Sequence, residues 1–160
     1  MNKKLLINIF LLFIIPALIT YILFSVYGLA FSKSKFNINE DFKTFNNFRY
    51  ILLHNQTIYL IILSGIFLFK IPTIISLISN GLSFGFYYAG IRGHGISSII
   101  ILLHAIPELL AFFIGALIVF KGLMYYRNNK VQFVKAIFFS EFLLLMAAAL
   151  ENYVTPNYFK

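Results

Sequence analysis

The sequence predicts an all-α fold, a polytopic helical membrane protein with about five transmembrane helices in a single membrane domain covering residues 1–160. Hydrophobic residues make up 61% of the chain and charged residues only 11%, whereas soluble domains carry about 25% charged residues. Several apolar runs reach about 20 residues, the length that crosses the hydrocarbon layer of a bilayer. Because these runs are continuous rather than alternating, they exclude a transmembrane barrel.

Charge and cysteine content narrow the functional classes. The net charge of +8 comes from Lys and Arg near the ends of the apolar runs, where such residues anchor a membrane protein and set its topology. No basic face stands apart from the spans, so we expect no nucleic-acid partner. The chain has no cysteine, which excludes disulfides and thiolate metal sites.

The expected spans follow one another along the chain. The first run contains Pro16, at which we expect a kink, and its apolar core exceeds the about 7–15 residues of a signal peptide, which favours a retained signal anchor. Residues 31–49 form the longest polar segment, and Pro72 stands where the third helix begins. The runs place the spans at about residues 5–30, 50–69, 71–89, 97–120 and 131–154.

Small residues in the third span predict close helix contacts. Gly81 and Gly85 have the GxxxG spacing that lets two helix backbones approach each other, and Asn80 beside them lies at mid-depth. We therefore expect the other helices to wrap this one. Further candidate packing positions are Gly65, Pro107 and Gly115.

The fourth span carries the strongest functional signal. His104 and Glu108 are spaced i, i+4 and so share one helix face. A charged side chain at the middle of a spanning helix costs about 2.5–3.5 kcal/mol on insertion scales, so such residues are rare and usually functional. Pro107 has no amide hydrogen, so the carbonyl of Leu103 needs another partner inside the bundle. We interpret this stretch as one wall of a buried polar site.

Residue counts from the span ends place polar groups of four helices in the same half of the bilayer. Three of the five acidic residues and two of the three histidines lie inside expected spans, which makes a common buried site the simplest interpretation. Its candidate members are His54, Asn55, Asn80, His104, Glu108, Glu141 and Glu151.

Three kinds of chemistry fit this set. In the first, the side chains hydrogen-bond to one another and fix the helix packing. In the second, two imidazoles and two carboxylates bind a zinc ion, although no HExxH motif is present; the ligands would be His54, His104, Glu108 and Glu151. In the third, the carboxylates and histidines form a path for protons or ions.

Four short motifs follow one another from Ile51 onwards, namely LLHNQ, SNGLSFG, LLHAIPELLAFFIGA and LENYVTP. Their order and spacing resemble the stage II sporulation protein M family, which also includes small membrane proteins from circular-bacteriocin gene clusters. The family block has a glutamate four residues after a histidine and an alanine three residues later. His104, Glu108 and Ala111 match this block, as do Asn55, Asn80, Gly81, Gly85 and Glu151 elsewhere, whereas Ala105 and Leu110 replace a usual glycine and proline.

The resemblance implies a non-enzymatic scaffold or component in the maturation, export or immunity of a bacteriocin-like peptide. Its expected partners are membrane lipids, other membrane proteins such as an ABC transporter, and a cationic peptide. Two alternatives remain open: an intramembrane metal-dependent peptidase or peptide ligase, and a partner in envelope remodelling as in sporulation. We expect a multi-pass protein of the bacterial cell membrane whose N-terminus is cytoplasmic, because basic residues slightly favour that side.

Overall fold

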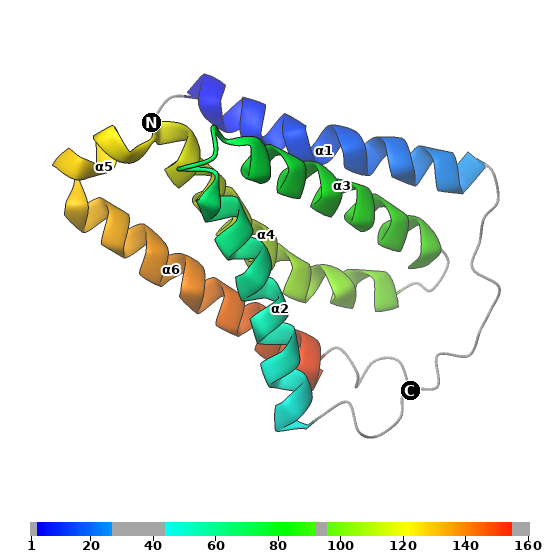
Figure 1. Cartoon of the computed structure of the whole chain (residues 1–160). Coiled ribbons are helices and arrows are strands. Elements are labelled where there is room, and N and C mark those ends of the chain that lie inside the picture. Colours follow the sequence, from blue (N-terminus) through cyan, green and yellow to red (C-terminus); the bar gives the residue numbers. More distant parts are fainter. Residues whose placement is uncertain (1–2, 27–43, 92–95, 155–160) are drawn as a thin grey trace.

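A computed structural model describes residues 3–26, 44–91 and 96–154. Every regular element in these ranges is a helix, which confirms the predicted all-α class. The elements are α1 (Lys3–Val26), α2 (Phe45–Ser64), α3 (Ile71–Ile91), α4 (Ile96–Lys121), α5 (Leu123–Asn128), α6 (Lys130–Ala149) and a π-helix, η2 (Leu150–Val154), as seen in Figure 1.

Three helical segments are long and apolar enough to cross a membrane: α1, Leu103–Lys121 of α4, and Lys130–Val154 of α6 and η2. The expected second and third spans form the helices α2 and α3, which do not reach the same apolarity. Amides and hydroxyls within both helices account for this, since each lowers the gain from transfer into hydrocarbon. The structure therefore gives three candidate spans where about five are expected, and the spans at α2 and α3 stay predictions.

A tight turn joins α2 to α3. Thr44 caps the start of α2, because its hydroxyl accepts a hydrogen bond from the amide of Asn47 at 3.3 Å, and the helix ends at Ser64. Phe69 and Lys70 then adopt positive φ angles of 51° and 68°, a backbone conformation that reverses the chain within a few residues. The hydroxyl of Thr73 donates a hydrogen bond of 2.7 Å to the carbonyl of Ile62, and this bond joins the start of α3 to the end of α2.

The helices α1 and α3 lie side by side along most of their length (Figure 1). Gly81 and Gly85 are buried there, and a methyl group on either glycine would collide with the backbone carbonyl of Phe13 or Ala17. The hydroxyl of Thr20 adds a hydrogen bond of 3.1 Å to the carbonyl of Leu82. The helix α3 thus packs mainly against α1, rather than being wrapped evenly by the other helices.

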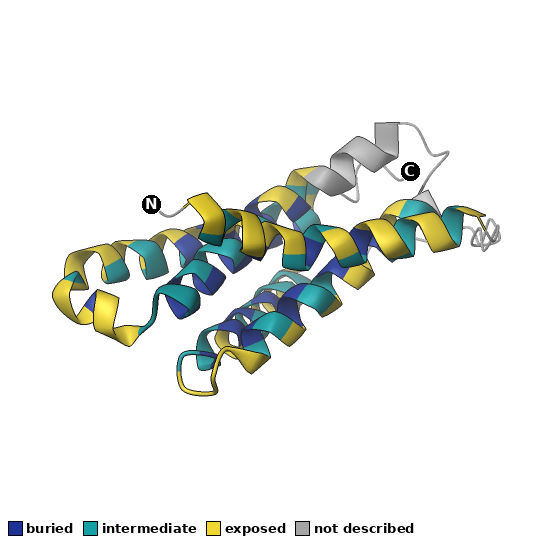
Figure 2. Ribbon diagram, turned by 90° about the horizontal axis from the view of Figure 1, so that it is seen from above, coloured by how far each residue is buried: buried dark blue, intermediate teal, exposed yellow. Residues whose placement is uncertain are grey.

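The remaining core lies where α2 crosses α4 and α6. Its buried side chains come mostly from these three helices and include Tyr59, Ile62, Phe112, Ala116 and Leu144. Figure 2 shows buried residues on the inner faces of the helices and exposed residues on their outer faces. Many of the exposed residues are large and apolar, a pattern that suits contact with lipid and is unusual for a protein in water.

Candidate functional site

Most of the polar side chains that the sequence marks as candidates lie along the contacts of α2 with α4, α6 and η2. We use the name polar seam for the set Asn55, Gln56, Tyr59, Glu108, Ser140, Glu141, Glu151 and Asn152. The inner face of α2 sets its position, because Asn55, Tyr59 and Ile62 follow helical spacing and are all buried. Their burial places the seam inside the helix bundle.

A side-chain hydrogen bond joins α2 to α6 within the polar seam. The amide nitrogen of Gln56 donates to the carboxylate of Glu141 at 3.1 Å. Both side chains are half-buried, so each satisfies a group that would otherwise be costly to remove from water. Glu141, a candidate for ion or proton chemistry in the sequence, has a structural partner here.

Substitutions at Glu141 test this bond. Glu141→Gln keeps an acceptor oxygen and should change the free energy of unfolding by less than about 0.5 kcal/mol, whereas Glu141→Leu leaves Gln56 without its partner and should cost about 1–2 kcal/mol. Equilibrium unfolding in detergent measures both. Equal stability of the two variants would show that the bond contributes nothing to the bundle.

Tyr59 occupies the centre of the polar seam. Its ring packs against Gly115 of α4, where an added Cβ would lie 2.6 Å from the ring. Its hydroxyl lies near Ser140 and Glu141 of α6, yet it has no hydrogen bond of good geometry. The hydroxyl of Ser140 instead donates to the carbonyl of Ala136 at 2.9 Å. The small residue Gly115 is therefore what admits the Tyr59 ring between α2 and α4.

Two carboxyl groups approach each other where α4 meets η2. Glu108 and Glu151 are half-buried, and their carboxyls interact electrostatically. The π-helical turns of η2 interrupt the regular α6 ladder, and such segments frequently occur at functional sites. Beside Glu151, Asn152 is buried and donates to the carbonyl of Thr44 at 3.3 Å, while its amide oxygen has no partner. This end of the seam thus retains unsatisfied polar groups.

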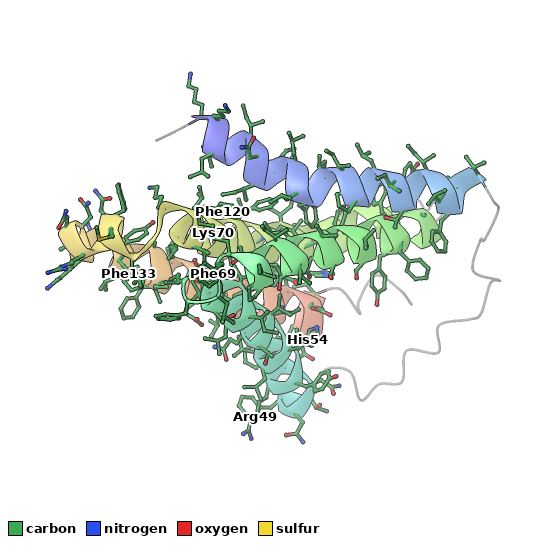
Figure 3. All side chains as sticks on the ribbon, turned by 45° about the horizontal axis from the view of Figure 1, so that its top comes forward. Arg49, His54, Phe69, Lys70, Phe120 and Phe133 are labelled. Carbon is green, nitrogen blue, oxygen red and sulfur yellow. The ribbon has the colours of Figure 1, made fainter. Side chains whose placement is uncertain are left out.

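Two of the candidate residues, His54 and Asn80, are not members of the polar seam. His54 is an exposed residue of α2 (Figure 3). Asn80 is half-buried and donates to the carbonyl of Ser76 in its own helix at 2.8 Å. His104 is half-buried on α4 and Pro107 is buried. The i, i+4 spacing therefore places His104 one turn from Glu108, while His54 and Asn80 lie apart from the seam.

The structure does not assemble the zinc ligands that the sequence suggested. Within residues 3–26, 44–91 and 96–154, no three His, Asp or Glu side chains form a group able to hold a metal ion. His54 is exposed, whereas Glu108 and Glu151 are half-buried. Glu108 and Glu151 are therefore not joined by both histidines of the expected zinc site.

Four members of the polar seam were absent from the sequence-based candidates: Gln56, Tyr59, Ser140 and Asn152. Tyr59 follows Asn55 at i+4, a spacing that could have identified it. Gln56 has no such signal, because only the position of α6 shows that it reaches Glu141.

Comparison with known proteins identifies the family of the chain. The model of the family described as Stage II sporulation protein M matches residues 9–156, nearly the whole chain. Neither the curated proteins nor the solved structures include a match to this sequence.

Proposed function

Because the chain belongs to the stage II sporulation protein M family, we propose that it is a non-enzymatic scaffold of the bacterial cell membrane that serves the maturation, export or immunity of a bacteriocin-like peptide. The hydrogen bond between Gln56 and Glu141 carries the scaffold part of this proposal. It uses a half-buried carboxylate to join two helices. A structural role of this kind for a seam residue supports packing rather than chemistry as the purpose of the polar seam.

The outer surface suits a scaffold as well. Large apolar side chains are exposed along α1, α4 and α6, the three helices apolar enough to span a membrane. Such faces contact lipid or the spans of other membrane proteins. We propose an ABC transporter and a cationic peptide as the partners.

Deletion of the gene in its native host tests the proposed role. We expect lower secretion of the peptide or greater sensitivity to it, with recovery when the gene is restored on a plasmid. Unchanged secretion and unchanged sensitivity would overturn the peptide-related role.

Envelope remodelling is the second candidate function, and the description of the family as a sporulation protein favours it. The same deletion strain distinguishes the two. Altered peptidoglycan fragments or a defect in sporulation, with normal peptide secretion, would favour remodelling.

Single cysteines test the proposed orientation. With a cytoplasmic N-terminus, the start of α2 faces outward and α5 faces the cytoplasm. Asn46 and Met124 are exposed at these two places, and the native chain has no cysteine. An impermeant thiol reagent should label Asn46→Cys in intact cells and Met124→Cys only after permeabilisation. The reverse pattern would place the N-terminus outside.

A further inference from the structure

An open pocket lies at the corner where α4 turns through α5 into α6. Its volume is about 430 Å³, and its lining residues are Leu123, Met124, Tyr126, Arg127 and Phe133. This volume falls in the range of about 300–1,000 Å³ that is typical of small-molecule sites. We call it the corner pocket. Its wall combines apolar and aromatic side chains with a single cation.

The local backbone explains why a pocket forms at this corner. Gly122 has a φ of 80°, which ends α4 and redirects the chain into the short helix α5. The ring of Tyr126 is buried and lies 5.2 Å from the ring of Phe133, so the two aromatic residues hold α5 against α6. Arg127 follows Tyr126 and is exposed, which places a cation at the edge of an apolar hollow.

The surroundings of the corner pocket are strongly basic. The ammonium group of Lys121 lies 4.5 Å from the centre of the Tyr125 ring, and that of Lys70 lies 5.4 Å from the centre of the Phe120 ring. Figure 3 shows Lys70 and Phe120 close together at this end of the molecule. Further basic residues at the same end, where α1 and α6 begin, are Lys3, Lys4, Lys130 and Lys135.

The acidic residues in the part of the chain that the structure describes do not line the corner pocket. Glu108 precedes the pocket on α4, and Glu141 and Glu151 follow it on α6 and η2. A ligand at this end therefore meets a positive field, which favours an anionic group.

Tyr126 lines the corner pocket as Arg127 does, and its phenol is a hydrogen-bond donor. Burial, and to a smaller extent the neighbouring Tyr125, raises the pKa of Tyr126. Its phenol therefore keeps its proton at neutral pH and can donate to an anion.

The expected depth of the corner pocket identifies the class of ligand. The segment Leu103–Lys121 ends and Lys130–Val154 begins on either side of it, so the pocket opens at the headgroup level of the bilayer. Tyr125 and Tyr126 at this corner agree with the enrichment of Tyr at membrane interfaces. Basic pockets between helices at this level bind anionic lipid headgroups.

We propose that the corner pocket binds an anionic phospholipid, with its phosphate at Arg127 and one acyl chain against Leu123, Met124 and Phe133. The proposal rests on the membrane location of α4 and α6 that underlies the proposed function. It assigns a lipid-binding site to a part of the chain that the polar seam does not use.

Lipid retention by the purified full-length protein tests the site. Native mass spectrometry should show preferential retention of phosphatidylglycerol over phosphatidylcholine. Arg127→Gln should weaken binding of phosphatidylglycerol about fivefold, the effect expected for one basic residue near anionic lipid. Arg49→Gln is the matched control, because Arg49 is also basic and exposed but lies near the start of α2, away from the corner pocket (Figure 3), and it should change binding less than twofold. Glycerol phosphate, which has no acyl chain, should not displace the lipid.

Equal retention of both lipids, or unchanged binding by Arg127→Gln, would overturn the lipid site. Equal losses of binding in the two variants would also overturn it, because they would indicate general attraction of the lipid to the basic surface. Displacement by glycerol phosphate would show that the pocket recognises a free phosphate instead. Thermal unfolding in detergent checks that both variants remain folded. If the native protein complements the deletion strain but shows no lipid selectivity, only the lipid-site proposal is contradicted. If it shows lipid selectivity but does not complement the strain, only the proposed function is contradicted.

Discussion

Gly81→Ala and Gly85→Ala should each destabilise the protein by about 1–3 kcal/mol, although alanine is the better helix former by about 1 kcal/mol. A Cβ at either position would collide with a backbone carbonyl, that of Phe13 or Ala17 on α1. A backbone atom has no rotamer with which to avoid the methyl group, so α1 and α3 must move apart and lose contacts along their length. The free energy of unfolding in detergent measures the effect.

Ser79→Ala is the matched control for these glycine variants, because Ser79 is exposed on the same helix. It should leave stability within about 0.5 kcal/mol of the native protein. If Gly81→Ala and Gly85→Ala are as stable as Ser79→Ala, then α1 and α3 do not pack through these two glycines.

Tyr59→Ala should be the most destabilising change in the polar seam, with a loss of about 3–5 kcal/mol. The Tyr59 ring is fully buried and fills the space left by Gly115 between α2 and α4. Removal of the ring leaves a cavity at the centre of the core that the three helices share. Thermal and denaturant unfolding in the same detergent both report this loss.

Tyr59→Phe separates the ring from the hydroxyl. Because the hydroxyl is buried without a partner, its removal should be neutral or slightly stabilising. A loss of more than about 1 kcal/mol in Tyr59→Phe would show that the hydroxyl makes a hydrogen bond that matters to the bundle.

Much of the fold follows from apolar run length and small-residue spacing. The family and the all-helical class are confirmed, and three helices are long and apolar enough to cross a membrane. GxxxG spacing indicates that Gly81 and Gly85 face a neighbouring backbone, but it does not identify that neighbour. Only the tertiary structure shows that the partner is α1.

The members of the polar seam were harder to predict. Counting residues from the span ends gives the depth of a side chain in the membrane but not the direction in which it points around the helix axis. His54 and Asn55 lie at nearly the same depth but point about 100° apart around α2. Asn55 shares the buried face with Tyr59 and Ile62, whereas His54 is exposed. The helical spacing of Tyr59 and Ile62 after Asn55 could therefore have predicted that Asn55, and not His54, faces the core. The bond between Gln56 and Glu141 was not readable in the same way, since it depends on how α2 crosses α6.

The activity of Glu108→Gln in cells, normalised to the amount of membrane-inserted protein, tests the central claim most directly. Gln keeps the size of the side chain and most of its hydrogen-bonding capacity but removes the carboxyl group. Glu151→Gln is the matched variant, because the two carboxyls interact. A scaffold that uses its polar seam for packing should restore peptide secretion and immunity to the deletion strain with either variant. Loss of both functions in a variant that is folded and inserted would contradict the scaffold role and make the Glu108–Glu151 pair a working site.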